Sequence, residues 1–125
     1  MTQPLTVLIV EDDPLDAELL VLQLARGGYA AEWERVDTPE AFTRALGPGL
    51  DVIFSDYRMP TFRGLEALRL LRDNGLDIPF ILISGSADEA DMAAAESAGA
   101  ADFLLKDNLA RLGEAVAQAL AQRRS

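Results

Sequence analysis

The chain has 125 residues, a formal net charge of −10, and neither cysteine nor histidine. The missing cysteine excludes a disulfide scaffold and a cysteine nucleophile, and the missing histidine excludes imidazole bases and histidine-ligated zinc. The charge argues against direct binding of nucleic acid, which proteins achieve mostly with Lys and Arg on phosphates. No apolar run approaches the roughly 20 residues of a membrane span, and no secretory signal is present, so we expect one cytoplasmic domain over residues 1–125.

Five short apolar runs alternate with helical patterns along the chain. Four of them are almost continuously apolar, as in strands buried on both faces of a parallel sheet. The second run is more polar, which is typical of an edge strand. In chain order, the predicted strands cover residues 5–10, 32–36, 52–55, 80–83 and 101–105.

Each predicted strand is followed by a segment whose apolar residues recur at helical spacing. The first helix starts with Asp13 as N-cap and Pro14 at the first helical position, where the missing N–H of proline is tolerated. For the fourth helix we expect a capping box formed by Ser86 and Glu89. In chain order, the helices are bounded by Asp13 and Gly27, Thr38 and Gly47, Leu65 and Asn74, Ser86 and Gly99, and Leu109 and Arg124.

This alternation predicts a parallel sheet covered by helices on both faces, that is, one doubly wound α/β domain. Ligands of such sheets bind beyond the carboxyl ends of the strands. Three carboxylates follow the first strand, and one polar residue follows each of the third, fourth and fifth, whereas the second contributes nothing obvious. These residues are Glu11, Asp12, Asp13, Asp56, Ser84 and Lys106, the single lysine of the chain.

Carboxylates held close together raise one another's pKa values unless a cation lies between them. Lys106 alone cannot neutralise this set, whereas Mg²⁺ or Mn²⁺ takes oxygen ligands from carboxylates. An anionic ligand that completes the metal shell would meet Lys106 and Ser84. The set therefore fits phosphoryl transfer to a carboxylate, with Asp56 as the acceptor. Singly, the residues have simpler interpretations, Asp13 as a helix cap and Phe103 as a core aromatic; their coincidence at one sheet edge favours a site.

Four motifs resemble, in order and spacing, those of the receiver domain of bacterial two-component response regulators, over essentially the whole chain. They are residues 8–14 (LIVEDDP), 55–60 (SDYRMP) followed by Gly64, 81–85 (ILISG), and 99–100 (GA) with 103–106 (FLLK). The resemblance, to a chemotaxis-type receiver with a flavodoxin-like fold, implies strand order 2-1-3-4-5 and five helices.

The resemblance also implies the roles of the site residues. Asp56 would accept a phosphoryl group from a sensor histidine kinase or phosphotransfer protein, in a self-catalysed modification without turnover of a substrate. Asp12 would bind Mg²⁺ directly and Glu11 through a water, and Asp56 and the backbone carbonyl of Arg58 would complete the protein ligands. Lys106 would contact the phosphoryl oxygens.

A two-state switch is implied as well. Ser84 would move toward the phosphoryl group while Phe103 swings inward, which couples the chemistry to the fourth helix, the fifth strand and the fifth helix. A downstream output protein or domain would bind that surface. We also expect exposed apolar side chains on the last helix, for which a homodimer and a docked domain are both left open.

Two residues depart from the family's pattern. Asp107 stands where many receivers have a proline after the lysine, often with a cis peptide bond. Because a non-proline cis bond costs about 2.5–4 kcal/mol, we expect a trans bond between Lys106 and Asp107. Arg63 stands where an acidic residue is frequent.

Three alternatives belong to other functional classes. A pseudo-receiver would bind partners without being phosphorylated, which the intact acidic pair, Asp56, Ser84 and Lys106 argue against. A flavin mononucleotide-binding protein of the same topology would need backbone N–H donors after the first strand, where carboxylates would repel the flavin phosphate. A phosphohydrolase of the haloacid dehalogenase type carries a second Asp two residues after its nucleophile, where this chain has Arg58.

Overall fold

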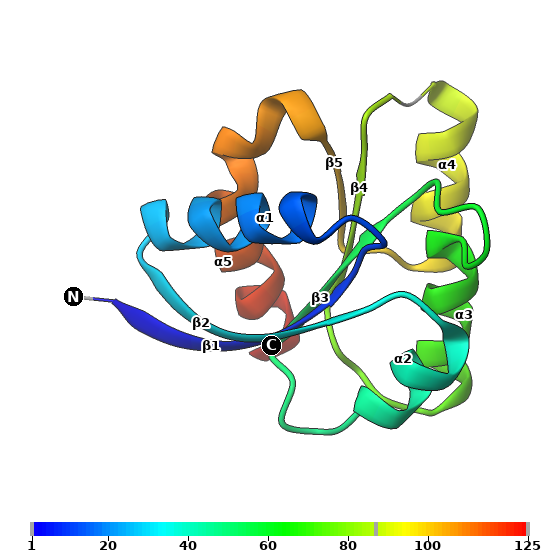
Figure 1. Ribbon diagram of the computed structural model, residues 1–125, viewed down its shortest axis with the longest axis horizontal. Coiled ribbons are helices and arrows are strands. Elements are labelled where there is room, and N and C mark those ends of the chain that lie inside the picture. The colour runs from blue at the N-terminus through cyan, green and yellow to red at the C-terminus, as the bar shows by residue number, and fades with distance from the viewer. Residues whose placement is uncertain (1, 87, 125) are drawn as a thin grey trace.

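Residues 2–86 and 88–124 are described by a computed structural model, without the side chain of Arg124. Five parallel strands form one sheet in the order β2-β1-β3-β4-β5 (Figure 1), which confirms the expected order. The strands are β1 (Gln3–Val10), β2 (Tyr29–Val36), β3 (Val52–Asp56), β4 (Phe80–Ser84) and β5 (Asp102–Leu105). The helices are α1 (Pro14–Arg26), α2 (Pro39–Ala45), α3 (Gly64–Asp73), α4 (Glu89–Ala98) and α5 (Leu112–Arg124), with a 3-10 helix, η1 (Lys106–Arg111), before α5.

Each face of the sheet carries its own apolar core, because successive strand residues point to opposite faces. α1 and α5 cover one face, and α2, α3 and α4 cover the other (Figure 1). The first core includes Ile9, Leu24, Phe54, Ile83 and Val116. The second includes Leu8, Phe42, Ile53, Leu68 and Phe103. The sheet is thus shielded on both faces, and its carboxyl edge remains for polar groups.

The strand register brings the ends of four strands to the same level. Val10 pairs with Ser55, Asp56 with Ile83, and Ser84 with Leu105. The residues that follow β1 and β5 therefore lie beside the last residues of β3 and β4. This register confirms the expected convergence at one edge of the sheet.

β2 begins at Tyr29, three residues before its expected start, and pairs with β1 along its whole length, from Gln3 opposite Tyr29 to Val10 opposite Val36. The two alanines near its start, Ala30 and Ala31, have a low strand propensity and do not mark the beginning of a strand in the sequence. Backbone pairing with the long β1 sets the length of β2 instead. Among the helices of residues 2–86 and 88–124, none is long and apolar enough to cross a membrane.

The expected capping box of Ser86 and Glu89 is wrong. Asp88 is the N-cap of α4: its Oδ1 accepts from the N–H of Asp91 at 2.9 Å, and Oδ2 of Asp91 accepts from the N–H of Asp88 at 3.2 Å. Ser86 bonds to Ser84 instead. The helix ends as expected at Gly99, whose φ of 95° is a left-handed conformation that favours glycine.

The chain between β5 and α5 also differs from the expectation of a helix that begins at Leu109. Asn108 has a non-helical backbone (φ −130°, ψ 42°), so η1 precedes a regular helix that starts at Leu112. Leu112 and Val116 of α5 are fully buried. The large exposed apolar side chains lie elsewhere, chiefly on α1, and comprise Leu15, Leu19, Leu22, Trp33 and Met92.

Candidate functional site

An acidic cluster occupies the edge where β1 and β3 end. Glu11, Asp12 and Asp56 each offer a carboxylate oxygen, and these oxygens lie within 4.8 Å of one another. Glu11 is buried, Asp56 is half-buried and Asp12 is exposed. The cluster is therefore closed toward the core and open toward solvent. Three hard oxygen donors in this arrangement suit a divalent cation such as Mg²⁺.

Glu11 is the most deeply buried carboxylate of the cluster, with a side chain that is 3% exposed. Burial is the main cause that raises the pKa of Glu11, to about 8, and the charge of Asp56 and a hydrogen bond to Asp12 raise it further. The backbone N–H of Asp13, at 3.1 Å, and the charge of Lys106 act in the opposite direction. A cation bound beside Glu11 would oppose this shift, because a nearby positive charge favours the ionised carboxylate.

β2, from which the sequence predicted no residue at this edge, contributes Arg35, which binds the backbone of Glu11. The guanidinium of Arg35 donates to the backbone carbonyl of Glu11 at 3.0 Å and pairs with Asp37 at 3.5 Å. This bond fixes the backbone at the end of β1, from which the buried carboxylate projects.

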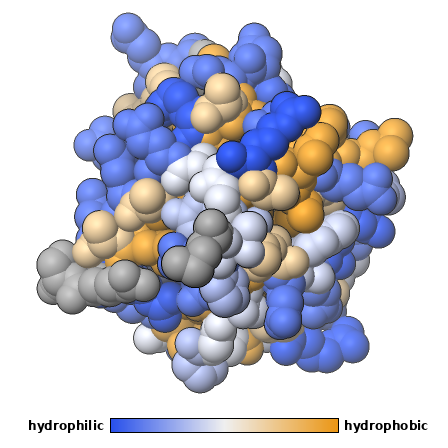
Figure 2. Space-filling model, turned by 90° about the vertical axis from the view of Figure 1, so that its left-hand side faces the viewer, coloured by the Kyte–Doolittle hydropathy of each residue, from blue (hydrophilic) through white to orange (hydrophobic). Residues whose placement is uncertain are grey.

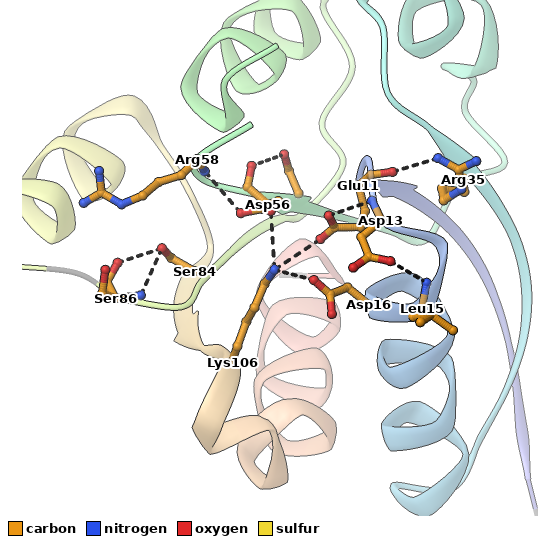
Figure 3. A network of polar contacts seen from close by, with 11 residues as sticks. Glu11, Asp13, Leu15, Asp16, Arg35, Asp56, Arg58, Ser84, Ser86 and Lys106 are labelled. Carbon is orange, nitrogen blue, oxygen red and sulfur yellow. Dashed lines mark hydrogen bonds and ion pairs between the residues drawn. The ribbon is translucent and has the colours of Figure 1, made fainter. Parts of the chain in front are cut away.

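Lys106 reaches the cluster from the end of β5 (Figure 3). Its Nζ lies 2.7 Å from Oδ2 of Asp16, 3.4 Å from Oδ2 of Asp56 and 3.6 Å from Oε2 of Glu11. Partial burial of the ammonium lowers its pKa, but the hydrogen bond to Asp16 and the charges of Glu11 and Asp56 outweigh burial and raise the pKa above its ordinary value. Lys106 is therefore a permanent cation in contact with Asp56.

Asp16 was missed in the sequence, although a signal for it existed. α1 begins at the sheet edge where the other polar residues gather, and Asp16 is the acidic residue of its first turn. Asp13 acts as the N-cap, as expected, with its Oδ1 accepting from the N–H of Leu15 at 2.9 Å. Asp16 is therefore free to bond to Lys106.

The backbone after Asp56 wraps closely around its carboxylate. The N–H of Arg58 donates to Oδ1 of Asp56 at 3.1 Å, and the N–H of Tyr57 donates to the carbonyl of Ile83 at 2.8 Å. Gly64, at the start of α3, packs so tightly that a Cβ there would lie 2.8 Å from the carbonyl oxygen of Asp56. Glycine is therefore required at position 64. The role of the Arg58 carbonyl as a metal ligand stays a prediction.

Ser84 reaches the expected edge, but its hydroxyl turns away from Asp56. Its Oγ donates to the carbonyl of Ser86 at 2.7 Å and accepts from the N–H of Ser86 at 3.4 Å (Figure 3). Phe103 lies below the site in the core and is 8% exposed. Its ring lies 5.1 Å from that of Tyr57. Tyr57 therefore links Phe103 to the loop that follows Asp56.

A second polar network joins this loop to α4. The phenol of Tyr57 donates to Oδ1 of Asp91 at 3.1 Å, and the guanidinium of Arg58, which extends away from Asp56 in Figure 3, pairs with Oδ2 of Asp91. Burial, followed by the bond to Asp91, raises the pKa of Tyr57. The N–H of Asp88, above all, lowers the pKa of Asp91, with Tyr57 and Arg58 contributing. A pocket of about 250 Å³ beside the network is lined by Tyr57, Arg58, Arg63 and Asp91, among others.

The structure thus brings Glu11, Asp12, Asp56 and Lys106 together, whereas Ser84 and Phe103 lie at the margin of this group. None of the peptide bonds in the described part of the chain is cis, so the bond between Lys106 and Asp107 is trans, as expected.

Comparison with known proteins agrees with this architecture. The response regulator receiver domain family matches residues 7–117. The alkaline phosphatase synthesis transcriptional regulatory protein SphR of Synechococcus elongatus is 30% identical over 110 residues, covering 80% of this chain and 42% of that protein. The transcriptional regulatory protein FixJ of Rhizobium meliloti is 37% identical over 103 residues, covering 81% and 49%.

The chain spans about half the length of the curated relatives it matches. Among solved structures, the signal receiver domain of the putative response regulator NarL from Mycobacterium tuberculosis is 30% identical, with a TM-score of 0.77 and 98% of both chains covered. The sequence match and the shared fold extend over the whole acidic edge. The chain belongs to the response regulator receiver domain family.

Proposed function

We propose that this receiver domain accepts a phosphoryl group on Asp56 in a Mg²⁺-dependent reaction, with a sensor histidine kinase or phosphotransfer protein as donor. The observation that carries the proposal is the position of Asp56, which lies between two further carboxylates and the ammonium of Lys106. A carboxylate can attack an anionic phosphoryl group only where a cation and a bound metal ion neutralise the negative charge, and Asp56 lies beside groups that can supply both.

The donor set fits Mg²⁺ or Mn²⁺. Asp12 and Asp56 would hold the ion directly, Glu11 through a water, and the carbonyl of Arg58 would add a neutral oxygen. When bound, the ion neutralises charge on the phosphoryl oxygens. The contacts of Lys106 support this assignment, because its one ammonium faces both Glu11 and Asp56 and leaves the carboxylates of the cluster in excess.

In the transfer step, a carboxylate oxygen of Asp56 forms a bond to phosphorus while the bond between phosphorus and the donor atom breaks. The donor atom is the imidazole nitrogen of a phosphohistidine, or the carboxyl oxygen of acetyl phosphate, and it keeps the electron pair of the broken bond. Lys106 stays protonated and pairs with the phosphoryl oxygens. The product is an acyl phosphate on Asp56. The modification is self-catalysed and turns over no substrate.

The signal would then reach the surface formed by α4, β5 and α5. Ser84 would exchange its bond to Ser86 for one to a phosphoryl oxygen, and the Phe103 ring would adjust with it. Phe103 and Met92, which is 46% exposed, both line a groove between α4 and β5. A change at Ser84 and Phe103 would alter the surface that an output protein, an output domain or a second copy of the chain could bind.

The kinase or phosphotransfer protein would approach from the open side of Asp56, beside α1. Leu15, Leu19 and Leu22 project from α1 with 67%, 50% and 47% exposure and offer an apolar surface for packing. Figure 2, which views the molecule from the left-hand side of Figure 1, shows hydrophobic patches among hydrophilic side chains. The expected cytoplasmic location of the domain is consistent with a donor kinase that uses cellular nucleotide.

The alternatives are less consistent with this geometry. The flavin phosphate would face Glu11, Asp12 and Asp56. The phosphohydrolase chemistry would need an acid where the side chain of Arg58 extends away toward Asp91. A pseudo-receiver would not need the contact between Lys106 and Asp56, and its test is the same as that of phosphorylation.

Intact mass spectrometry tests the proposal. Wild type and Asp56→Asn are incubated with acetyl phosphate, each with Mg²⁺ and with a chelator. We expect one phosphoryl adduct on wild type with Mg²⁺ and none in the other samples. An adduct of equal yield on Asp56→Asn would overturn the assignment of Asp56. No adduct on either protein, from acetyl phosphate or from candidate kinases, would favour the pseudo-receiver.

A further inference from the structure

The three carboxylates around Lys106 are not equivalent, and the nearest is not the proposed phosphoacceptor. Nζ of Lys106 lies 2.7 Å from Asp16 but 3.4 Å from Asp56. Lys106 is the single lysine of the chain, and no ion pair among the described residues joins an arginine to these carboxylates. Asp16 and Asp56 therefore share one ammonium.

We propose that Asp16 is a positioning residue that holds Lys106 on α1 in competition with the phosphoryl group. Phosphorylation of Asp56 would have to draw the ammonium away from Asp16. This inference rests on the proposed phosphorylation of Asp56 and adds to it a residue that sets how strongly the site binds an incoming phosphoryl group.

Within the described residues, Asp16 has no structural role besides its bond to Lys106. Asp13, not Asp16, caps α1, and the recorded hydrogen bond of the Asp16 side chain is the one it accepts from Lys106. Its place in the first turn of α1 sets the carboxylate beside the positive end of the helix dipole, a favourable position for an acidic side chain. A charged Asp16 therefore attracts Lys106 whenever no stronger anion is present.

The bond also joins two elements across the site. Asp16 belongs to α1 and Lys106 is the first residue of η1, 90 positions later in the chain. Asp16 and Lys106 line a small pocket of about 50 Å³ together with Leu19, Leu20 and Leu109, among others. Moving Lys106 to a phosphoryl group would remove this polar link between α1 and η1.

The substitution Asp16→Asn is expected to favour phosphorylation. It frees Lys106 for the phosphoryl oxygens and removes one negative charge that repels an anionic donor. We expect the second-order rate constant for uptake from acetyl phosphate to rise about two- to fivefold, the range for an ion pair whose side chains are 31% and 32% exposed.

The matched control is Glu18→Gln. Glu18 is an exposed carboxylate of the same helix and is in none of the ion pairs of the described residues, so this variant changes the net charge equally without touching Lys106. Asp16→Glu keeps the charge and should return the rate to near that of wild type. In a Lys106→Ala background, Asp16→Asn should change the rate no more than Glu18→Gln does.

A second measurement does not depend on phosphorylation. Because the chain has one lysine, protein made with lysine labelled by ¹⁵N at the ε position gives a single ammonium signal in the NMR spectrum. That signal should shift in Asp16→Asn and stay in place in Glu18→Gln.

The outcomes separate this inference from the proposed function. Uptake by wild type, with equal rates for Asp16→Asn and Glu18→Gln, would overturn the role of Asp16 and leave the phosphoacceptor standing. No uptake by wild type would overturn the proposed function and, with it, the competition at Asp56. An ammonium signal that does not move in Asp16→Asn would overturn the pairing of Asp16 with Lys106 in either case.

Discussion

The two sides of Asp56 satisfy their charges in different ways. On the side of α1, Lys106 is shared among Asp16, Asp56 and Glu11, and the exposed Asp12 adds one more negative charge. On the side of α4, Tyr57, Arg58 and Asp91 form a closed network in which the one carboxylate has both a guanidinium and a phenol as partners. The first side has an excess of negative charge and the second is balanced.

This difference indicates that the two sides of the site have different functions. An unbalanced cluster gains most from a bound cation, because each unpaired carboxylate raises the free energy of the others. A balanced network gains little from an ion but keeps its shape, and it couples Asp56 to α4 through the two residues that follow Asp56. We therefore expect substitutions near α1 to change ligand binding and those near α4 to change mainly the stability of the fold.

The largest effect on stability is expected for Phe103→Ala. Phe103 is 8% exposed and packs on Tyr57 at 5.1 Å between ring centroids. Its removal should lower the free energy of unfolding by about 3 kcal/mol, as for other large aromatic side chains in cores. Urea denaturation measures the change. Met92→Ala, on the same surface but 46% exposed, serves as the control and should lose less than about 1 kcal/mol.

An intermediate effect is expected for Mg²⁺ binding in Asp12→Asn. This variant should lower the affinity for Mg²⁺ at least about tenfold, since even groups outside the ligand shell change metal affinity by that factor. Asp13→Asn is the matched control, because it removes the same charge while asparagine keeps the helix cap. Isothermal titration calorimetry compares the two. A greater loss in Asp13→Asn would mean that the second and third residues of the acidic run have been assigned in the wrong order.

The smallest effect is expected for Tyr57→Phe, which removes one hydrogen bond to Asp91. The loss should be about 0.5–1 kcal/mol in the free energy of unfolding. Because the pKa of Tyr57 is raised from its ordinary value of 10.0, this contribution is fully present below about pH 10 and disappears as the pH rises through the folded-state pKa.

The control for this variant is Tyr29→Phe. Tyr29 is buried, and none of the hydrogen bonds recorded for residues 2–86 and 88–124 joins its hydroxyl to another residue. Denaturation of both variants at neutral and at high pH tests the sign. A loss in Tyr57→Phe that persists undiminished at high pH would show that the phenolic proton is not the source of its stability.

The α/β alternation, the sheet and the acidic edge could be predicted because they depend on local patterns. Apolar runs give strands, helical spacing gives helices, and parallel strands bring their carboxyl ends to one edge. For the same reason, Asp13 and Pro14 marked the start of α1 correctly. The capping box failed where two candidates lay close together, since Asp88 could bond with Asp91 while Ser86 was already bonded to Ser84.

The contacts of Asp16 and Asp91 could not be predicted in this way. Asp16 meets Lys106 across 90 positions of the chain, and Asp91 meets Tyr57 across 34. Such pairs depend on how the helices sit on the sheet and on which rotamers their side chains adopt. Neither leaves a periodic signal in the sequence.

The order of the elements, the doubly wound sheet and the group of Glu11, Asp12, Asp56 and Lys106 at its edge follow from patterns in the sequence. How that group divides its charges depends on the packing of the helices on the sheet, which sets the carboxylate that holds Lys106, the direction of the Ser84 hydroxyl and the contact of Tyr57 with α4. The physical reason is the distance along the chain over which each interaction acts. Hydrophobic periodicity and capping act within a few residues, whereas a shared ammonium or a bond between helices forms only after the sheet register has fixed the distances between distant parts of the chain.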